Sequence, residues 1–404
     1  MGRGDVVELA GQRVRLEELR AHPHRYTRLF TEAKAVDGHG RCLCRTDEPR
    51  RLVIRCLNTR HFLARWPGDG AEHQDACPFH QPDPTLSGRS AYADNAIVEG
   101  VEGTTIRFCT PLLSTTATAA AEGAAEDLRA AAAGSGRRTV GLLGVLHFLW
   151  ENAQLNTWRP GIHRNWASVV HDISHCAQDC TLSRRALTEV LYPVPPYRPD
   201  IGPANIAAFE AWLDRLRSPR DQIRRGLLLG ELVEAHPTKY GMSYKIRHLA
   251  KKLFLSEQLH QRILRSYPAA FARAATEHSG RRIGLFLLER TPKGHAVVAD
   301  AAIMLTTGST YIPADSSHEL VMAAALQQAG RTFLKPVRYD HTALTLPDFV
   351  LTDTTEPTVV EVWGLDSEEY LRRKEIKIGE YQRCGTHLIG WRPPEPLPDL
   401  ALPR

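Results

Sequence analysis

The sequence lacks any apolar run near the roughly 18 residues that a membrane-spanning helix needs. Its first residues, Met1-Gly2-Arg3-Gly4-Asp5, also lack the apolar stretch of a secretory signal peptide. These two absences argue against membrane and exported proteins. We therefore expect a soluble, cytoplasmic protein with no membrane partner.

A strong excess of either charge is missing too. The chain has 51 Lys and Arg against 46 Asp and Glu, a net charge of +5, which is mild for a nucleic-acid binder. Basic residues nevertheless gather at 215–225 and 245–252, with Tyr240 and Tyr244 close by. Neutralisation of phosphates and an ordinary solvated helical face explain this pattern about equally well.

Cysteine is scarce, with eight residues in 404, and most of them lie near histidines. This usage fits metal binding in a reducing compartment better than a disulfide framework. The clearest group is Cys42-Leu43-Cys44 followed by His73 and Cys77, the ligand types that zinc takes tetrahedrally. We expect a structural zinc site made by Cys42, Cys44, His73 and Cys77, with His80 or Cys56 as alternative ligands. The intervening 52–56 and 60–66 are expected to form a hairpin.

A second group of soft ligands, His171, His175, Cys176 and Cys180, lies in a stretch with helical spacing. The two histidines share one helix face and the two cysteines share another, because residues four apart are neighbours on a helix. One helix cannot easily surround an ion in this way. These residues are therefore expected to be core or surface residues rather than metal ligands.

The length predicts two to three domains, and we expect an α+β multidomain protein. Residues 114–138 lack large apolar groups and are typical of a linker. The expected order is a Cys/His zinc-binding β domain at 1–113, this linker, a helical domain at 139–277 and an α/β domain at 278–404. Within the helical domain, Trp166 to Val190 is compatible with two helices of a winged-helix-like unit. A hairpin at 283–306 is expected to extend the C-terminal sheet.

Two carboxylates near the end of the chain carry the strongest functional signal. Asp348 precedes the apolar run Phe349-Val350-Leu351, and Glu361 lies within Val359-Val360-Glu361-Val362-Trp363. A lone carboxylate in such surroundings is costly to bury without a partner. If the two strands pair, both carboxylates can hold a hard cation such as Mg²⁺. The alternative without a functional site is an ordinary hairpin whose acidic residues face water.

Helices flank this pair. Ser316 and Glu319 suit a helix start, which would place Glu319 in the first turn. In the helix after Glu361, the residues Tyr370, Lys374, Lys377 and Tyr381 share one face. The expected order over 316–392 is helix, strand, strand, strand, helix, strand. An ordinary charged surface helix is the alternative for the lysines.

These elements resemble the PD-(D/E)xK restriction-endonuclease-like superfamily, over about the last quarter of the chain. The resemblance implies a Mg²⁺- or Mn²⁺-dependent site that cuts DNA, with Asp348 and Glu361 as metal ligands. Trp363 stands where the family has its basic residue, so Lys374 or Lys377 would supply that charge and Glu319 would assist.

A second resemblance spans most of the chain. Cys42-Leu43-Cys44, His73, Cys77 and a run from Leu146 to Trp158, together with Glu361-Val362-Trp363-Gly364 and Tyr370, are similar to an uncharacterised bacterial family often carried on plasmids and integrative elements. The function of this family is unknown, so the resemblance implies no activity. The sequence therefore leaves two hypotheses, a metal-dependent DNA nuclease of a mobile element and a catalytically inactive DNA-binding or assembly protein, with DNA and proteins of the same element as partners.

Overall fold

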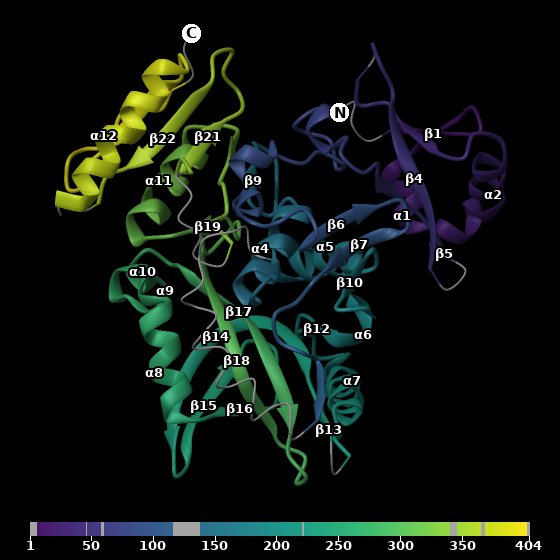
Figure 1. Ribbon diagram of the computed structural model, residues 1–404, viewed down its shortest axis with the longest axis vertical. Helices are drawn as coiled ribbons and strands as arrows, with labels where there is room; N and C mark the ends of the chain where they lie inside the picture. The colour runs from purple at the N-terminus through teal and green to yellow at the C-terminus, as the bar shows by residue number, and fades with distance from the viewer. Residues whose placement is uncertain are drawn as a thin grey trace.

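The computed structural model (Figure 1) describes residues 6–45, 47–57, 60–115, 138–219, 222–339, 346–364 and 368–401. These residues form a mixed α+β structure with several sheets, as expected. Within the described part of the chain, no helix is both long and apolar enough to cross a membrane. Most of the predicted linker at 114–138 lies outside the described residues, although its first two residues belong to a strand.

The N-terminal unit is a five-stranded antiparallel sheet in the order β2-β1-β3-β4-β5. Its strands are β1 (Val6–Leu9), β2 (Gln12–Arg15), β3 (Gly40–Cys42), β4 (Arg50–Leu57) and β5 (Arg60–Arg65), and its helices are α1 (Leu16–Ala21) and α2 (Thr27–Val36). The predicted hairpin is confirmed as β4 and β5. Helix α2 buries Leu29, Phe30 and Ala33 against the sheet because these side chains recur at helical spacing.

A second unit joins segments from both sides of the 114–138 region. Its four-stranded sheet, in the order β11-β10-β7-β6, consists of β6 (Ile97–Gly100), β7 (Gly103–Ile106), β10 (Cys180–Leu182) and β11 (Arg185–Ala186). Three helices accompany it, namely α4 (Leu142–Asn152), α5 (Trp166–Ala177) and α6 (Leu187–Val190). All residues of α4 from Leu142 to Glu151 are buried, as expected for a helix that is apolar nearly all round.

The winged-helix-like interpretation of Trp166 to Val190 requires correction. Helix α5 exists as predicted, but the second helix is reduced to α6 at 187–190, because the residues before it form the β10–β11 hairpin. Ser183 and Arg184 have φ angles of 46° and 71°, the left-handed conformation that a tight two-residue hairpin turn requires at both central positions. Asn, Asp and Gly are the residues favoured at two such positions, so Ser183-Arg184 is a weak local signal for this hairpin.

The largest sheet has seven strands and lies at the bottom of Figure 1. Its strands are β12 (Leu191–Pro193), β14 (Gly226–Thr238), β15 (Gly241–Ile246), β16 (Leu253–Leu255), β17 (Arg281–Arg290), β18 (Ala296–Thr306) and β19 (Pro313–Ala314). Helices α7 (Gly202–Arg215), α8 (Glu257–Ser266), α9 (Pro268–Phe271) and α10 (Arg273–Glu277) accompany it. A separate two-stranded pair joins β8 (Leu113–Thr115) to β13 (Gln222–Arg224).

The expectation of a helical domain at 139–277 is therefore wrong for its second half. Strand β14 begins with buried Leu227, Leu228 and Leu229, and a short continuous apolar run of this kind fits a buried strand or a buried helix equally. The hairpin predicted at 283–306 exists as β17 and β18, but β17 pairs with β14 rather than with the C-terminal sheet. The boundary placed at 277/278 thus cuts through one sheet.

The C-terminal sheet has the order β23-β22-β21-β20-β9. Its elements are α11 (Ser317–Gln328), β20 (Phe333–Leu334), β21 (Phe349–Leu351), β22 (Thr358–Val362), α12 (Glu368–Arg383) and β23 (His387–Trp391). They follow the order predicted for 316–392. The edge strand β9 (Thr157–Trp158) comes from the predicted middle domain, which ties that region to this sheet.

Candidate functional site

Asp348 and Glu361 meet on one face of the C-terminal sheet. Strands β21 and β22 are antiparallel with Phe349 opposite Val360, so the same register continued by one residue places Asp348 opposite Glu361. Residues opposite each other on such strands project to the same face. Asp348 Oδ2 accepts a hydrogen bond of 2.8 Å from the backbone N–H of Val362. Both side chains are buried, so they are not the water-facing acids of an ordinary hairpin.

Helix α12 brings Lys377 and Tyr381 onto Glu361. The Lys377 Nζ donates to Glu361 Oε1 and Oε2 at 2.8 and 2.9 Å and also to the carbonyl of Leu346 at 2.8 Å. The Tyr381 hydroxyl donates to Glu361 Oε1 at 2.5 Å. These contacts show that the predicted helix face turns toward the carboxylates at Lys377 and Tyr381.

Lys374 and Tyr370, the other residues predicted on that face of α12, are not seen in contact with the carboxylates. The Lys374 Nζ is 4.8 Å from the ring centroid of Trp363, a cation–π geometry. The side chain of Tyr370 lies outside what the structure describes. Of the two lysines proposed to supply the missing basic residue, Lys377 is therefore the one seen on a carboxylate of the pair.

Glu319 belongs to the same cluster through a lysine that the sequence analysis did not select. Lys335, which follows β20 and is only 1% exposed, places its Nζ 2.9 Å from Glu319 Oε2 and 3.0 Å from Asp315 Oδ2. Arg338 lies 3.0 Å from Asp315 and 3.7 Å from Asp348, and so links the two halves of the cluster. The available signal was a lysine directly after buried Phe333 and Leu334, which has to be paired if buried.

The start of α11 positions Glu319 as predicted. Ser316 is the N-cap, and its hydroxyl accepts from the Glu319 N–H at 3.2 Å. The Glu319 carboxylate in turn accepts from the backbone N–H of Asp315 at 3.0 Å. This reciprocal arrangement fixes the first turn and directs the carboxylate toward Lys335.

Burial and mutual repulsion set the protonation of the cluster. Burial raises the pKa of Asp348 to about 6, with Glu361 adding to the rise, and burial raises the pKa of Glu319 to about 7 although Lys335 opposes it. The pKa of Asp315 is held well below its usual range, despite burial, by Lys335 and Arg338. Four carboxylates thus share three cations, which leaves capacity for further positive charge.

The Cys/His group near the N-terminus converges as expected. One ligand atom each from Cys42, Cys44, His73 and Cys77 lies within 4.8 Å of all the others, and all four residues are buried. The Cys42 and Cys77 sulfurs are 3.5 Å apart, and His73 Nδ1 is 3.4 Å from the Cys44 sulfur and 3.5 Å from that of Cys77. A zinc tetrahedron has S–S and S–N edges of roughly 3.8 and 3.6 Å, given its bond lengths. The group can therefore hold a metal ion.

The thiol chemistry agrees with this. A hydrogen bond from Cys77 lowers the pKa of the Cys42 thiol, while that hydrogen bond and burial raise the pKa of Cys77 and burial raises that of Cys44. Cys42 is therefore the sulfur that most readily becomes a thiolate ligand. Of the alternative ligands, His80 directs Nδ1 to the carbonyl of His73 at 3.1 Å and Cys56 is exposed. Neither belongs to the group.

Within the described part of the chain, this is the only group of three or more His, Cys, Asp or Glu residues whose ligand atoms lie that close together. The ligand atoms of the second soft-ligand group, His171, His175, Cys176 and Cys180, do not lie that close together. The carboxylates around Asp348 also do not form such a group. A cation at that site would need rearrangement of their present partners.

The basic middle region is largely paired with acids. Lys245 contacts Glu234, Arg247 contacts Glu231 and Lys251 contacts Glu210. Tyr244 is fully buried and bonds to His260, whereas Tyr240 is exposed at the β14–β15 turn. Fewer basic side chains at 215–225 and 245–252 are therefore available for phosphate binding than the sequence alone suggested.

Comparison with known proteins identifies the family of this chain but does not indicate an activity. A search of the curated proteins and a search of the solved structures gave no match to this chain. One protein family, described as "Protein of unknown function (DUF1173)", matches residues 13–393. Because this match covers nearly all of the sequence, the chain belongs to the DUF1173 family.

Proposed function

We propose that this chain is a divalent-metal-dependent DNA endonuclease whose C-terminal unit is of the PD-(D/E)xK kind. The observation that carries the proposal is the buried pair Asp348 and Glu361 on neighbouring strands, with the ammonium of Lys377 on Glu361. Neighbouring strands that deliver two carboxylates beside a lysine suit phosphodiester hydrolysis, in which negative charge builds up on the phosphate.

Each residue then has a role. Asp348 and Glu361 would hold Mg²⁺ or Mn²⁺, which supplies charge neutralisation on the scissile phosphate and a bound water of lowered pKa. Lys377 places an ammonium beside Glu361, where it can stabilise charge that develops on a phosphate oxygen. Glu319 is a further oxygen donor, and Lys335 holds it in place through an ion pair.

The test is cleavage of plasmid DNA with Mg²⁺ or Mn²⁺ by the full chain and by two variants. Asp348→Ala and Glu361→Gln should each reduce cleavage by at least about 100-fold, because each removes a cation ligand. The matched control is Glu375→Gln on the exposed side of α12, which should cleave as the unchanged chain does. Thermal unfolding of every variant separates loss of activity from loss of fold. Cleavage that survives both active-site changes in folded protein contradicts the proposal.

A second candidate function is a catalytically inactive DNA-binding or assembly protein. One observation favours it, namely that Lys377 already bonds both carboxylate oxygens of Glu361, so a metal ion has to compete with an ammonium. Such a protein would retain DNA but cut no supercoiled, linear or single-stranded form with either metal. DNA retention without cleavage therefore selects this function over the nuclease.

We further propose that the Cys/His group holds a structural zinc ion. All four positions are protein groups, which leaves no open position for water. Eight free cysteines fit a reducing, cytoplasmic setting. On the sequence resemblance described above, we place the protein on a plasmid or integrative element, with DNA and proteins of that element as its partners.

A further inference from the structure

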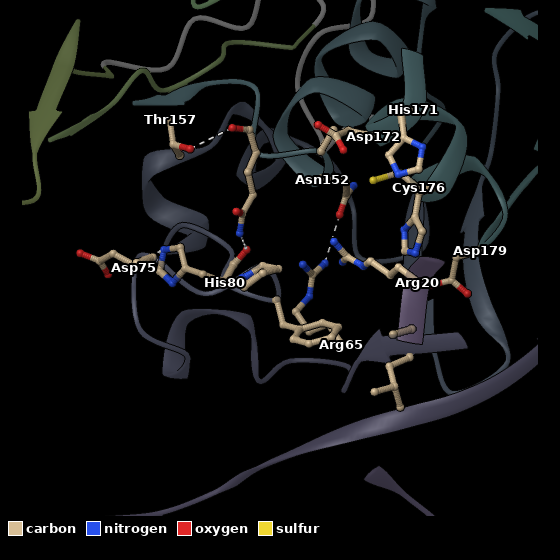
Figure 2. Close-up of a pocket in the computed structure, with 18 of the residues that line it drawn as sticks. Arg20, Arg65, Asp75, His80, Asn152, Thr157, His171, Asp172, Cys176 and Asp179 are labelled. Atoms are coloured by element: carbon tan, nitrogen blue, oxygen red, sulfur yellow. Dashed lines mark hydrogen bonds and ion pairs between the residues drawn. The ribbon is translucent and has the colours of Figure 1, made fainter. Parts of the chain in front are cut away.

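A cavity of about 560 Å³ lies where three parts of the molecule meet. Its walls come from β5 of the N-terminal sheet, the 75–80 loop after His73, helix α5, and the edge of the C-terminal sheet at β9 and β20. Figure 2 shows labelled side chains from several of these segments around the same space. The volume suits a small-molecule ligand. None of the carboxylates or lysines proposed for DNA cleavage lines it.

A buried arginine supplies positive charge to this cavity. Arg164 donates to the backbone carbonyls of Gln154, Leu155, Thr157 and Thr310 at 2.7 to 3.1 Å. Burial lowers the pKa of its guanidinium to about 10, which still leaves the group charged at neutral pH. Backbone carbonyls hold this guanidinium in place, and the Asp172 carboxyl interacts with it electrostatically.

Helix α5 also lies close to arginines. His175 lines the cavity, and its pKa is lowered to about 3 by burial and by the nearby guanidiniums of Arg20 and Arg60, with the His171 ring adding to the effect. Asp179 pairs with Arg55, and Glu99 pairs with Arg65 and Arg89, whereas the Asp172 carboxyl lies near Arg20, His171 and Arg164. Burial raises the pKa of Asp172, which favours its neutral form, so an anion beside Arg20 would be stabilised by the guanidinium.

Other walls are apolar or offer neutral polar groups. Phe62, Phe79 and Trp158 provide aromatic surface, and the indole Nε1 of Trp158 is buried without a hydrogen-bond partner among the described residues. Asn152 adds a carboxamide, and Asp172 adds a carboxyl group from the α5 wall. Aromatic surface stacks on bases, and such polar groups match the donors and acceptors of a base edge or a sugar hydroxyl.

We infer that this cavity binds a nucleoside phosphate, either free or as one nucleotide of a nucleic-acid strand. The phosphate lies toward Arg20 and His171, and the base lies against the aromatic walls. The inference goes beyond the proposed nuclease function, because the cavity and the Asp348–Glu361 pair have no lining side chain in common.

The test is calorimetric titration of the full chain with inorganic phosphate, nucleoside 5′-monophosphates, the matching nucleosides and a short single-stranded oligonucleotide. A monophosphate should bind at one site per chain, and the nucleoside should bind at least about tenfold more weakly because it lacks the charge-assisted contacts. Preference for the oligonucleotide over the free monophosphate identifies a strand as the source, and the reverse identifies a free nucleotide.

Variants locate the site. Arg20→Gln and His171→Gln should each weaken binding of the monophosphate by at least about tenfold, through loss of positive charge or of a donor. Arg28→Gln, an exposed arginine on α2, is the control and should leave binding unchanged. Asp348→Ala should bind as the unchanged chain does, so this result is independent of whether DNA is cut. Absence of binding by every probe, or equal binding by all variants, overturns the inference.

Discussion

The buried charges near the C-terminal sheet are each paired with a side chain from another element, as Glu361 is with Lys377 and Lys335 is with Glu319. Asp348 and Glu361 could be selected because carboxylates inside apolar strand-like runs need partners. Lys335 satisfies the same criterion, yet most of helix α11 lies between it and its partners Asp315 and Glu319 in the sequence. These residues become neighbours only when α11 packs beside β20. A buried cation is visible in the sequence, but the acids that neutralise it are not.

Glu151 on α4 is a buried acid for which the structure predicts a pH effect. It is 2% exposed, and its Oε2 has no hydrogen-bond partner among the described residues. Burial raises the pKa of Glu151 from 4.5 to about 7. Since the folded pKa exceeds the unfolded one, folding favours the protonated form. This carboxyl therefore costs stability as pH rises from 4.5 to 7, and the full cost remains above 7.

We expect Glu151→Gln to gain stability relative to the unchanged chain as pH rises. Between pH values of about 5 and about 8, the difference in unfolding free energy should move in favour of the variant by up to about 3 kcal/mol. Urea unfolding at several pH values measures this difference. The exposed Glu32→Gln variant should show no such change. A difference that is constant with pH would contradict the assigned cause.

Elements with a clear local pattern were predicted, and those that depend on distant partners were not. The helix and strand order over 316–392 follows from caps, turns and short apolar runs. Strand β14 was missed because its leucines fit a buried helix as well as a buried strand, and what decides between them is pairing with β17, more than 50 residues away. The hairpin β17–β18 was found, but its place in the larger sheet was not.

Helix α12 provides a comparison between two lysines on one element. Lys377 contacts Glu361, whereas Lys374 stacks on Trp363. Under the proposed function, Lys377→Met should reduce DNA cleavage by about 10²–10³-fold, because a donor beside the reacting phosphate is lost. DNA cleavage by Lys374→Met should stay within a few-fold of the unchanged chain, since this variant loses a cation–π contact with Trp363 worth about 1 kcal/mol but no contact with a carboxylate of the site. Equal losses in both, measured with Mg²⁺ on supercoiled plasmid, would point to a general effect of helix charge on DNA binding.

At the scale of the whole molecule, loops of the N-terminal half are built into the C-terminal site. The Gly88 N–H donates to the carbonyl of Val337 at 2.8 Å. A Cβ at position 88 would lie 2.3 Å from the carbonyl carbon of Arg338, so only glycine allows this approach next to the arginine that links Asp315 and Asp348. These two segments were predicted to lie in separate domains, because nothing local in either segment indicates their contact.

The loop that carries His73 and Cys77 makes a similar connection. Gln154 donates to the carbonyls of Cys77 and His80, at 2.9 and 2.7 Å, and Arg159 donates to that of Ala76 at 2.6 Å. The Cys/His group therefore lies at one end of a loop whose other contacts are with the segment that follows α4. Under the zinc proposal, loss of the ion should loosen both the N-terminal sheet and this junction, because four buried ligands would lose their common partner.

We expect one zinc ion per chain by elemental analysis, and loss of it on chelation. Removal should lower the melting temperature and increase hydrogen exchange of the amides between 73 and 80, which include the Cys77-to-Gln74 and His80-to-Cys77 hydrogen bonds. Cys44→Ser should lose zinc and behave as the chelated chain does, whereas Cys56→Ser, at an exposed cysteine, should keep both zinc and stability. A Cys44→Ser protein with full zinc content would rule out this set of ligands. If chelation increases hydrogen exchange only in strands β1–β5, the contacts between the 73–80 loop and the segment after α4 do not depend on the metal.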